Sequence, residues 1–484
     1  MTRLKPTMPN EYPPGTVDDG PHVASDELLG DLLDAGVACD TSSPVRAAHG
    51  RDWWPLSIPD VAAGRVPRWP GVVVRPASSA DVSRVLAIAS RRGVAVTAQG
   101  GRSGVVGGAV APEGAIALDL TALDRILGLD EVSGTVSVEA GVFGPDLEAF
   151  VRERGFTVGH FPQSFELATV GGWLACRGAG QYSNRYGTIE DIVRGLTVVL
   201  AGGDVIELGG RGPRQAVGPD LVQLFVGSEG TLGVITRATL ALRRSPSFER
   251  RCAFGFPSFD EGMGACRRIL QRGAHPAVLR LYDETESRRS FDVDTNALVV
   301  LDEGDRALVT ATIEIVHDEC RAATILDESL VARWFTQRND VGALAALWEH
   351  GVVVDTIEIA GAWATLGPIR DAVFSALEGE GATIMVSVHQ SHAYLDGACL
   401  YFTFAGRPDG DPTPYYRRCW DLATRAVLEN GGALSHHHGV GRNRARFVAE
   451  ALDSAFPVLV ALKRSLDPAN LLNPGVLGIG AQPW

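Results

Sequence analysis

The 484-residue sequence has little that would tie it to a membrane, to nucleic acid or to an oxidising compartment. Its seven cysteines form no Cys-x-x-Cys pair, and their odd number fits free thiols better than a disulfide framework. Acidic residues outnumber basic ones by 58 to 44, which argues against general nucleic-acid binding. The N-terminus lacks the apolar core of a secretory signal. The longest apolar runs, such as 196–201, are far shorter than the ~20 residues of a bilayer span. We therefore expect a cytoplasmic protein without a transmembrane segment.

A chain of this length predicts two or three domains, at roughly 150 residues per domain. The first 20 or so residues are rich in Pro, Gly and Asp and are expected to form a mobile tail. The pattern changes at Pro70 and again near 243–246, where Arg-Arg-Ser-Pro suggests a boundary. Together with the helix expected from residue 446, these changes divide the chain into segments 1–67 (the tail and lead-in helices), 68–246, 247–445 and 446–484.

Hydrophobic periodicity predicts a mixed α+β fold. A β-α-β unit is expected at the start of the second segment, with strands at 72–74 and 94–97 around a helix that ends at Gly93. Other expected strands are 116–120, 135–139, 196–200, 205–208, 234–242, 297–301 and 398–404, and other expected helices are 145–153, 261–272, 366–377 and 446–466. Strands and helices do not alternate strictly, so an α+β architecture is favoured.

Three glycine clusters follow within about 140 residues. Residues 99–108 hold five glycines directly after a predicted strand. Glycines at this density allow backbone N–H groups to turn toward an anion such as a diphosphate. The spacing matches neither common nucleotide-binding fingerprint, and an ordinary glycine-rich turn is the alternative for this loop alone. With the clusters at 169–173 and 227–236, the three loops predict an extended cofactor.

These clusters belong to an ordered set of motifs that resembles the FAD-binding domain of the vanillyl-alcohol oxidase / p-cresol methylhydroxylase (PCMH) superfamily. The set consists of Pro76, Gly100-Gly101, Glu139-Ala140-Gly141, Gly171-Gly172, Tyr186-Gly187, 218–221 and 227–236. The resemblance implies an α+β fold in which 68–246 form a PCMH-type FAD-binding domain of two α+β subdomains and 247–445 an α/β cap domain. The motif at 467–475 implies that 446–484 return to the FAD-binding domain.

The resemblance also implies FAD as the cofactor, with its diphosphate held by residues 99–104. The other two loops would line the ribityl chain, the adenosine and the edge of the isoalloxazine. Several relatives attach FAD to a histidine in the first loop, where this chain has Arg102, so FAD is expected to be non-covalent. The implied cofactor-binding residues are Gln99, Gly100, Gly101, Arg102, Ser103, Gly104, Thr169, Val170, Gly171, Gly172, Glu229, Gly230, Thr231, Val234, Ile235 and Asn473.

Within the superfamily, the chain is most similar to the alkylglycerone-phosphate synthases, over most of residues 68–475. This likeness rests on 159–173, 186–191, 396–402 and 435–441. It implies that Tyr401 is a general acid or base and His437 the central catalytic histidine. The other implied active-site residues are His436, His438, His160 and Arg280. A core position for Tyr401 and a surface ion pair for Arg280 are the structural alternatives.

The run of three histidines at 436–438 could hold a metal, stabilise the fold or serve acid–base chemistry. Neighbouring side chains point in opposite directions on a strand and lie about 100° apart on a helix, so they are not expected to converge on one ion. No Cys or carboxylate cluster at ligand spacing stands nearby. We therefore expect no metal, and one or two imidazoles that face the flavin.

One position departs from the synthase pattern. The family places an arginine for the substrate phosphate about eleven residues before an acidic-Ser/Thr-x-Glu element, which is 355–358 here, and the match falls on Leu344. An apolar side chain cannot pair with a phosphate, and the nearest upstream cation is Arg338. Either another arginine, such as Arg102, Arg442 or Arg444, binds the phosphate, or the substrate has none there.

Two enzyme functions remain open on this scaffold. The resemblance implies ether-lipid synthesis, in which the acyl group of an acyl-dihydroxyacetone phosphate is exchanged for a long-chain alkyl group through an adduct at flavin N5. The alternative is an FAD-dependent oxidoreductase that oxidises an alcohol or a 2-hydroxy acid, such as D-lactate or glycolate, by hydride transfer to N5. A flavoprotein without turnover is a third class. The expected partners are a small-molecule or lipid substrate and a second copy in a homodimer. A peripheral membrane contact stays open.

Overall fold

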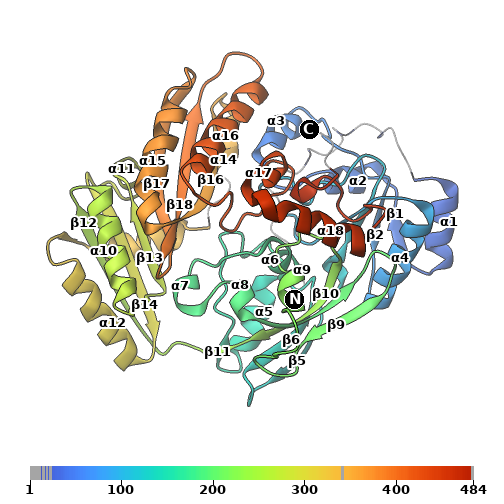
Figure 1. Ribbon diagram of the computed structural model, residues 1–484, viewed down its shortest axis with the longest axis horizontal. Helices are drawn as coiled ribbons and strands as arrows, with labels where there is room; N and C mark the ends of the chain where they lie inside the picture. The colour runs from blue at the N-terminus through green and yellow to red at the C-terminus, as the bar shows by residue number, and fades with distance from the viewer. Residues whose placement is uncertain (1–11, 13–16, 18–19, 21–23, 340–342, 481–484) are drawn as a thin grey trace.

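The computed structural model describes residues 12, 17, 20, 24–339 and 343–480. The predicted mobile tail falls almost wholly outside these residues. The described chain forms two halves (Figure 1). One half contains the N-terminal and C-terminal segments with two larger sheets and a two-stranded sheet of β7 (Phe156–Thr157) and β11 (Arg243–Arg244), and the other, which we call the cap, contains a single large sheet. The α+β fold class is confirmed.

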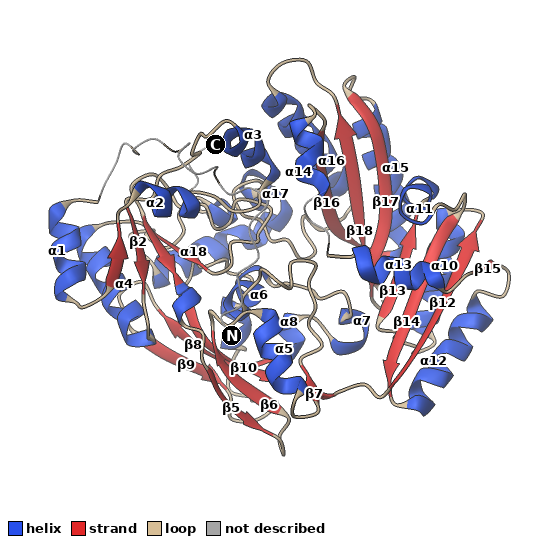
Figure 2. Ribbon diagram, turned by 180° about the vertical axis from the view of Figure 1, so that it is seen from behind, coloured by secondary structure: helices blue, strands red, loops and turns tan. Residues whose placement is uncertain are grey.

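The first half contains a four-stranded and a five-stranded sheet (Figure 2). The four-stranded sheet has the order β1-β2-β4-β3, in which β2, β4 and β3 are parallel and β1 is antiparallel. The five-stranded sheet, β5-β6-β10-β8-β9, is antiparallel throughout. Their strands are β1 (Ala38–Asp40), β2 (Val72–Arg75), β3 (Val96–Gln99), β4 (Ile116–Asp119), β5 (Ile126–Asp130), β6 (Thr135–Glu139), β8 (Val193–Val199), β9 (Val205–Gly209) and β10 (Val234–Ala241).

The predicted β-α-β unit is confirmed as β2, α4 (Ser79–Arg92) and β3. The Ser78 side chain accepts a hydrogen bond from the N–H of Asp81 at the start of α4, and Gly93 closes the helix at a φ of 65°. A residue without a side chain meets no steric penalty in that left-handed conformation. The other helices of this half are α1 (Asp26–Asp34), α2 (Ser43–His49), α3 (Ile58–Ala62), α5 (Gly144–Arg152), α6 (Val170–Cys176), α7 (Ser183–Tyr186), α8 (Ile189–Ile192) and α9 (Leu221–Phe225).

The cap is built on one antiparallel sheet of seven strands in the order β15-β12-β14-β13-β17-β18-β16. The strands are β12 (Phe248–Phe256), β13 (Val278–Tyr282), β14 (Asn296–Gly304), β15 (Thr324–Leu326), β16 (Val353–Ala362), β17 (Thr383–Ala393) and β18 (Gly397–Gly406). Helices α10 (Phe259–Gln271), α12 (Arg306–Glu319), α15 (Trp363–Glu378) and α16 (Pro412–Glu429) pack with one face of this sheet in the main hydrophobic core. Alternate residues of each strand therefore face these helices or the opposite side, where α11 (Glu284–Phe291), α13 (Ser329–Gln337) and the other half of the molecule lie.

Two expectations about the ends of the chain were wrong in detail. The segment before residue 68 contains a strand as well as helices, because β1 pairs with β2 at the edge of the first sheet. The single helix predicted over 446–466 is instead α17 (Val448–Leu452) and α18 (Phe456–Leu466). Asp453 between them has a φ of 44°, and Pro457 lies in the first turn of α18. Proline has no N–H to donate, so it fits the first turn of a new helix better than the middle of a continuous one.

The C-terminal segment returns to the first half, as the resemblance implied. Leu472 forms a parallel bridge with Val96 of β3. The ammonium group of Lys463 donates to the carbonyl oxygens of Thr231 and Leu472 and to Asp467, all within 2.8 Å. These bonds hold the last helix against a predicted cofactor loop. No helix among the described residues is long and apolar enough to cross a bilayer, and all seven cysteines are free thiols.

Candidate active site

A cavity of about 710 Å³ joins the glycine-rich loops to the inner face of the cap sheet. Glycines of all three predicted clusters line its first part. Side chains from β13, β17, β18 and the loop after α16 line its second part. The predicted site residues that line this cavity are Gln99, Gly100, Gly101, Arg102, Ser103, Gly104, Thr169, Gly171, Gly172, Glu229, Gly230, Val234, Ile235, Arg280, Tyr401, His437 and His438.

Four polar side chains of the cap lie in one row across the sheet. Tyr401 of β18 pairs in register with Glu358 of β16 on one side and His389 of β17 on the other, and His389 pairs with Tyr282 of β13. Leu400 and Phe402, the neighbours of Tyr401, face the helices in the core. The period of two along a strand therefore turns Tyr401 toward the cavity, and a purely core position for it is wrong.

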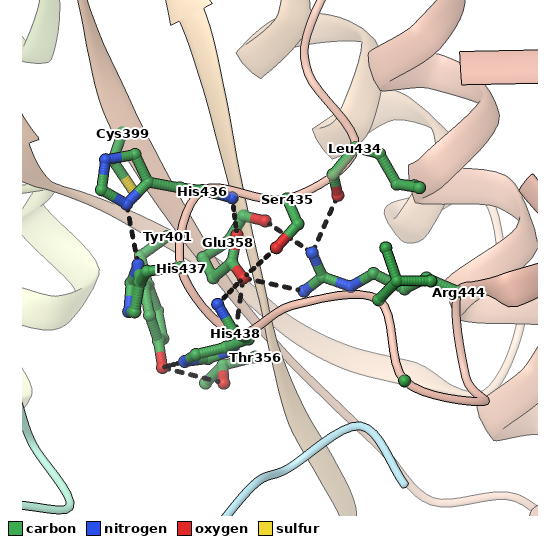
Figure 3. A network of polar contacts seen from close by, with 12 residues as sticks. Thr356, Glu358, Cys399, Tyr401, Leu434, Ser435, His436, His437, His438 and Arg444 are labelled. Carbon is green, nitrogen blue, oxygen red and sulfur yellow. Dashed lines mark hydrogen bonds and ion pairs between the residues drawn. The ribbon is translucent and has the colours of Figure 1, made fainter. Parts of the chain in front are cut away.

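Tyr401, His438 and Glu358 form a chain of polar contacts, which we call the relay (Figure 3). The hydroxyl of Tyr401 lies 3.1 Å from Nε2 of His438 and 3.3 Å from Oγ1 of Thr356. On the far side of the imidazole, Nδ1 of His438 lies 3.6 Å from Oε1 of Glu358. A tautomer with its proton on Nδ1 would accept the phenolic proton at Nε2 and point its own proton at the carboxylate.

Glu358 is the fully buried anchor of this arrangement. Its carboxylate accepts hydrogen bonds from the hydroxyl of Ser435 and from the backbone N–H groups of His436 and His438, at 2.6 to 2.8 Å. Nη2 of Arg444, also fully buried, lies 3.3 Å from Oε1 (Figure 3). Burial opposes ionisation of Glu358, but Arg444 and the neighbouring groups outweigh it and hold its pKa well below the usual range.

Apart from the charged Glu358, the side chains of this group are neutral at neutral pH. Burial lowers the pKa of His438 to about 4 and that of His437 to about 3, and it raises the pKa of Tyr401 above its usual value. A neutral imidazole next to a protonated phenol can accept a proton, while the buried Glu358 carboxylate would stabilise the resulting imidazolium.

Adjacent histidines do converge here, contrary to the expectation from strand and helix geometry. Residues 436–438 lie in a bend rather than in a strand or helix, and Nδ1 of His436 lies 2.8 Å from Nδ1 of His437. His392 stacks on His436 with ring centres 4.8 Å apart, and the ring nitrogens of these three residues lie within 4.8 Å of one another. Several of these nitrogens have other partners, since Nε2 of His436 is 2.6 Å from the Tyr394 hydroxyl and Nδ1 of His392 is 2.9 Å from Oγ of Ser183.

Arg280 lines the cavity, whereas His160 and His436 do not. Nη2 of Arg280 lies 2.9 Å from Nε2 of His389, so this arginine is not a surface ion pair. The imidazole of His160 is buried against Trp173, with ring centres 4.7 Å apart, and neither of its nitrogens has a partner among the described residues. Burial lowers the pKa of His160 to about 3, so it is a neutral group behind the cofactor loops.

Comparison with known proteins agrees with this geometry. Residues 70–209 match the model of an FAD binding domain, and residues 245–477 match that of the C-terminal domain of FAD linked oxidases. An uncharacterized FAD-linked oxidoreductase, YgcU, of Escherichia coli O157:H7 is 30% identical over 434 residues, 84% of this chain and 89% of the relative. The chain belongs to the FAD-linked oxidase family.

Members of the family with a named reaction include alkyldihydroxyacetonephosphate synthase, another name for alkylglycerone-phosphate synthase. The enzyme of Trypanosoma brucei brucei is 29% identical over 472 residues, 88% of this chain and 75% of the relative. A solved structure of such a synthase aligns with 95% of this chain, and the alignment spans 87% of the synthase chain. The TM-score is 0.80 and the sequence identity is 26%. The p-cresol methylhydroxylase structure shares the fold, with a TM-score of 0.74, 17% identity, and coverage of 94% of this chain and 98% of that one.

As a member of this family the chain uses FAD, and the glycine loops leave room for it. A Cβ atom built on Gly104 would come no closer than 3.7 Å to any other group, and one on Gly230 no closer than 3.8 Å, so both residues border open space in the cavity. Nε of Arg102 is buried there without a hydrogen-bond partner among the described residues. Small residues and an unpaired cationic donor suit a bound diphosphate.

Three residues expected to bind FAD do not line the cavity. Val170, the first residue of α6, packs in the hydrophobic core, and Thr231 donates its hydroxyl hydrogen bond to the carbonyl of Ser228. Asn473 instead ties loops together, because its amide donates to the carbonyl oxygens of Gly108 and Glu229 at 2.9 and 2.8 Å. These residues shape the FAD loops from behind.

The positions of several polar residues in the site of this FAD-linked family member were not predicted from the sequence. His389 and Glu286 lie beside Arg280, and Glu358 and Arg444 lie behind the histidines. Five of the six residues 387–392 are polar although this part of β17 is buried, and this was the available signal for His389. Of the three cations considered for the phosphate, only Arg102 lines the cavity, since Arg442 and Arg444 are bonded to backbone carbonyls. The side chain of Leu344 lies outside the described part.

Proposed function

We propose that this FAD-linked enzyme exchanges the acyl group of an acyl-dihydroxyacetone phosphate for a long-chain alcohol. The carbon–oxygen bond to the fatty acid breaks, a carbon–oxygen bond to the alcohol forms, and the products are an alkyl-dihydroxyacetone phosphate and a free fatty acid. The alcohol gives up one proton and the leaving carboxylate carries the negative charge, so no net oxidation occurs. This is the ether-forming step of ether-lipid synthesis.

The observation that carries the proposal is the relay of Tyr401, His438 and Glu358, of which Tyr401 and His438 line the cavity shared with the FAD loops. Further support is the 29% identity to the Trypanosoma synthase over 88% of this chain. FAD supplies a ring that can take up and return an electron pair. The chain's own residues would handle the protons, with the Tyr401 hydroxyl facing the substrate.

In this proposal the neutral His438 accepts the phenolic proton at Nε2 when Tyr401 acts as a base. The Glu358 carboxylate holds the imidazole in the required tautomer and stabilises it once it is charged. When the alcohol binds, the same two side chains return the proton or accept the alcohol's own. A group that can both donate and accept a proton suits an exchange without net oxidation.

Oxidation of a 2-hydroxy acid is the second candidate. It is favoured by Arg280 and His389, a cation and a neutral imidazole 2.9 Å apart on the cavity wall. The arginine could pair with a carboxylate while the imidazole takes the hydroxyl proton. The glycolate oxidase subunit GlcD of Bacillus subtilis is 27% identical over 84% of this chain.

A product assay separates the two candidates. FAD-loaded enzyme is given palmitoyl-dihydroxyacetone phosphate and deuterated hexadecanol, and the lipids are analysed by mass spectrometry. The proposed function predicts equal amounts of palmitate and deuterated alkyl product. Glycolate and D-lactate with an artificial electron acceptor should give no product. Oxidation of either acid without any ether product would refute the exchange and support the second candidate.

We also propose that the protein is a cytoplasmic homodimer. Light scattering on the eluate of a sizing column would give the molecular mass directly. A mass near twice 51.4 kDa supports the dimer, and a mass near that of one chain contradicts it.

A further inference from the structure

Three arginines lie close together on the part of the cavity wall that the cap forms. All three come after the glycine loops in the sequence. Arg280 lies on β13, Arg289 on α11 (Glu284–Phe291), and Arg338 at the C-terminal end of α13 (Ser329–Gln337). The guanidinium carbons of Arg280 and Arg338 lie 5.7 and 5.8 Å from the ring centre of Trp334. Both guanidinium groups therefore lie close to the same indole ring.

The third cation is joined to the first through Glu286. Nδ1 of His389 is 2.8 Å from Oε2 of Glu286, and its Nε2 is 2.9 Å from Nη2 of Arg280. Nη2 of Arg289 lies 3.5 Å from Oε1 of the same carboxylate. Burial opposes ionisation of Glu286, but His389 and Arg289 lower its pKa to about 2, so it is charged.

The charges of this cluster do not balance. Three guanidinium groups face one carboxylate, and burial lowers the pKa of His389, which keeps the imidazole neutral at neutral pH. Among the described residues lining the cavity, the other carboxyl groups are engaged elsewhere. Glu229 accepts from the N–H groups of Val440 and Gly441, and Asp355 accepts from the Tyr416 hydroxyl. The cluster therefore carries an excess of positive charge, which the Asp283 carboxyl near Arg289, outside the cavity lining, offsets in part.

Donor groups of the cluster also lack partners. Nε of Arg280 and Nε of Arg338 are buried with no hydrogen-bond acceptor in the described chain. Arg338 donates from Nη1 to the carbonyl of Phe335 and stacks on the Phe335 ring at 3.6 Å. Capping the helix thus uses one of its nitrogens and leaves the buried Nε for a ligand.

We propose that Arg280, Arg289 and Arg338 form the subsite for a phosphate monoester on the substrate. The inference rests on the proposed function and names the residues that replace the arginine absent at Leu344. A phosphate monoester has a second pKa of about 6 and carries nearly two negative charges at neutral pH, which matches the unbalanced charge. A carboxylate carries only one negative charge and would offset less of the positive charge of the three guanidinium groups. A planar guanidinium group can also donate two parallel N–H hydrogen bonds to two oxygens of one phosphate.

A binding experiment tests the subsite without any turnover. FAD-loaded protein is titrated calorimetrically at pH 7.5 with dihydroxyacetone phosphate and, separately, with glycolate. The matched controls are Arg288→Gln, next to Arg289 but paired with Glu284 and Asp294, and Arg333→Gln on α13, which donates to the carbonyl of Phe291. Arg289→Gln and Arg338→Gln should each weaken binding of the phosphate by about tenfold or more, and the controls by less than about twofold. Glycolate should bind the unmodified protein about tenfold more weakly than the phosphate does.

Unchanged affinity for dihydroxyacetone phosphate in both cavity variants would overturn the subsite, as would glycolate binding as tight as that of the phosphate. Retained FAD absorbance and far-ultraviolet circular dichroism confirm that each variant is folded. The two proposals fail separately. Arginine-dependent phosphate binding without ether formation would refute only the exchange reaction, and ether formation with arginine-independent binding would refute only the subsite.

Discussion

The hydroxyl of Tyr401 lies 3.1 Å from Nε2 of His438, although the two residues come from different parts of the cap. Tyr401 is held by the register of β18, and His438 by the Glu358 carboxylate that binds its backbone N–H. A strand fixes one partner and a buried anion fixes the other. The pair therefore has a defined geometry before any substrate binds.

Tyr401→Phe should remove the proton transfer and leave the cofactor in place. The phenyl ring keeps its stacking on His389, whose ring centre is 4.8 Å away, but loses the hydroxyl. We expect kcat to fall by about 10²- to 10⁴-fold, the usual contribution of a general acid or base. Steady-state kinetics with the flavin content measured in parallel checks this. Tyr415→Phe, at a buried position of α16, is the control. A normal kcat in Tyr401→Phe would show that Tyr401 has no part in the mechanism.

Glu358→Gln should destabilise the folded protein as well as slow its reaction. The substitution leaves the fully buried Arg444 without its counter-charge, and loss of one partner of such a pair costs about 3 to 5 kcal/mol. Urea denaturation at pH 7 measures the free energy of unfolding. Glu380→Gln, which breaks the exposed pair with Arg418, is the matched control and should cost under about 1 kcal/mol. Equal losses in the two variants would contradict the anchoring role of Glu358.

His438 should make stability depend on pH in one direction. Burial lowers its pKa to about 4, so as pH falls below about 6.5 the unfolded chain takes up a proton that the folded chain refuses. The folded state is therefore disfavoured as the solution becomes more acid. Between pH 7.5 and 5.0 the free energy of unfolding of the unmodified protein should fall by about 2 kcal/mol more than that of His438→Gln.

The comparison with His438→Gln removes the contributions of the other titrating groups, which both proteins share. These include Glu229, whose pKa burial raises to about 7 and which therefore acts in the opposite direction. Denaturation curves at the two pH values provide the four free energies. An equal loss in both proteins would mean that His438 is not held neutral.

Gly104→Val should fill the space in which FAD binds without unfolding the protein. The φ of Gly104 is not in the left-handed region, and a Cβ there has its nearest neighbour, Oδ2 of Asp52, at 3.7 Å. We expect purified protein with about a tenth or less of the normal flavin content and unchanged circular dichroism. Gly128→Val, on β5 away from the cavity and with nothing near its Cβ, is the control. Normal flavin content in Gly104→Val would place FAD elsewhere.

The sequence predicted most of the fold because its signals are local. The β2-α4-β3 unit was predicted from the apolar spacing along α4 and from Gly93 at its end. The break between α17 and α18 was missed because apolar periodicity continues across it, although Pro457 marked the new helix. Strand β1 is only three residues long and is defined by pairing with β2, which no local pattern reveals.

The site was predictable only in part, because its contacts are long-range. The resemblance named Tyr401 and the histidines, but it emphasised His437, whereas the hydrogen bond of Tyr401 is with His438. Glu358 and Arg444 are brought to the histidines by the pairing of β16 with β18 and by the loop after α16. The arginine cluster combines β13, α11 and the end of α13, so its net charge exists only in the folded chain.

The most direct test of the central claim is the flavin spectrum of the FAD-loaded enzyme without oxygen. The visible flavin band is followed while glycolate, D-lactate and longer 2-hydroxy acids are added, and then palmitoyl-dihydroxyacetone phosphate followed by hexadecanol. The proposed exchange predicts no bleaching by any hydroxy acid, a spectral change with the lipid phosphate, and its reversal by the alcohol. Full bleaching by a hydroxy acid, with no response to the lipid phosphate, would contradict it.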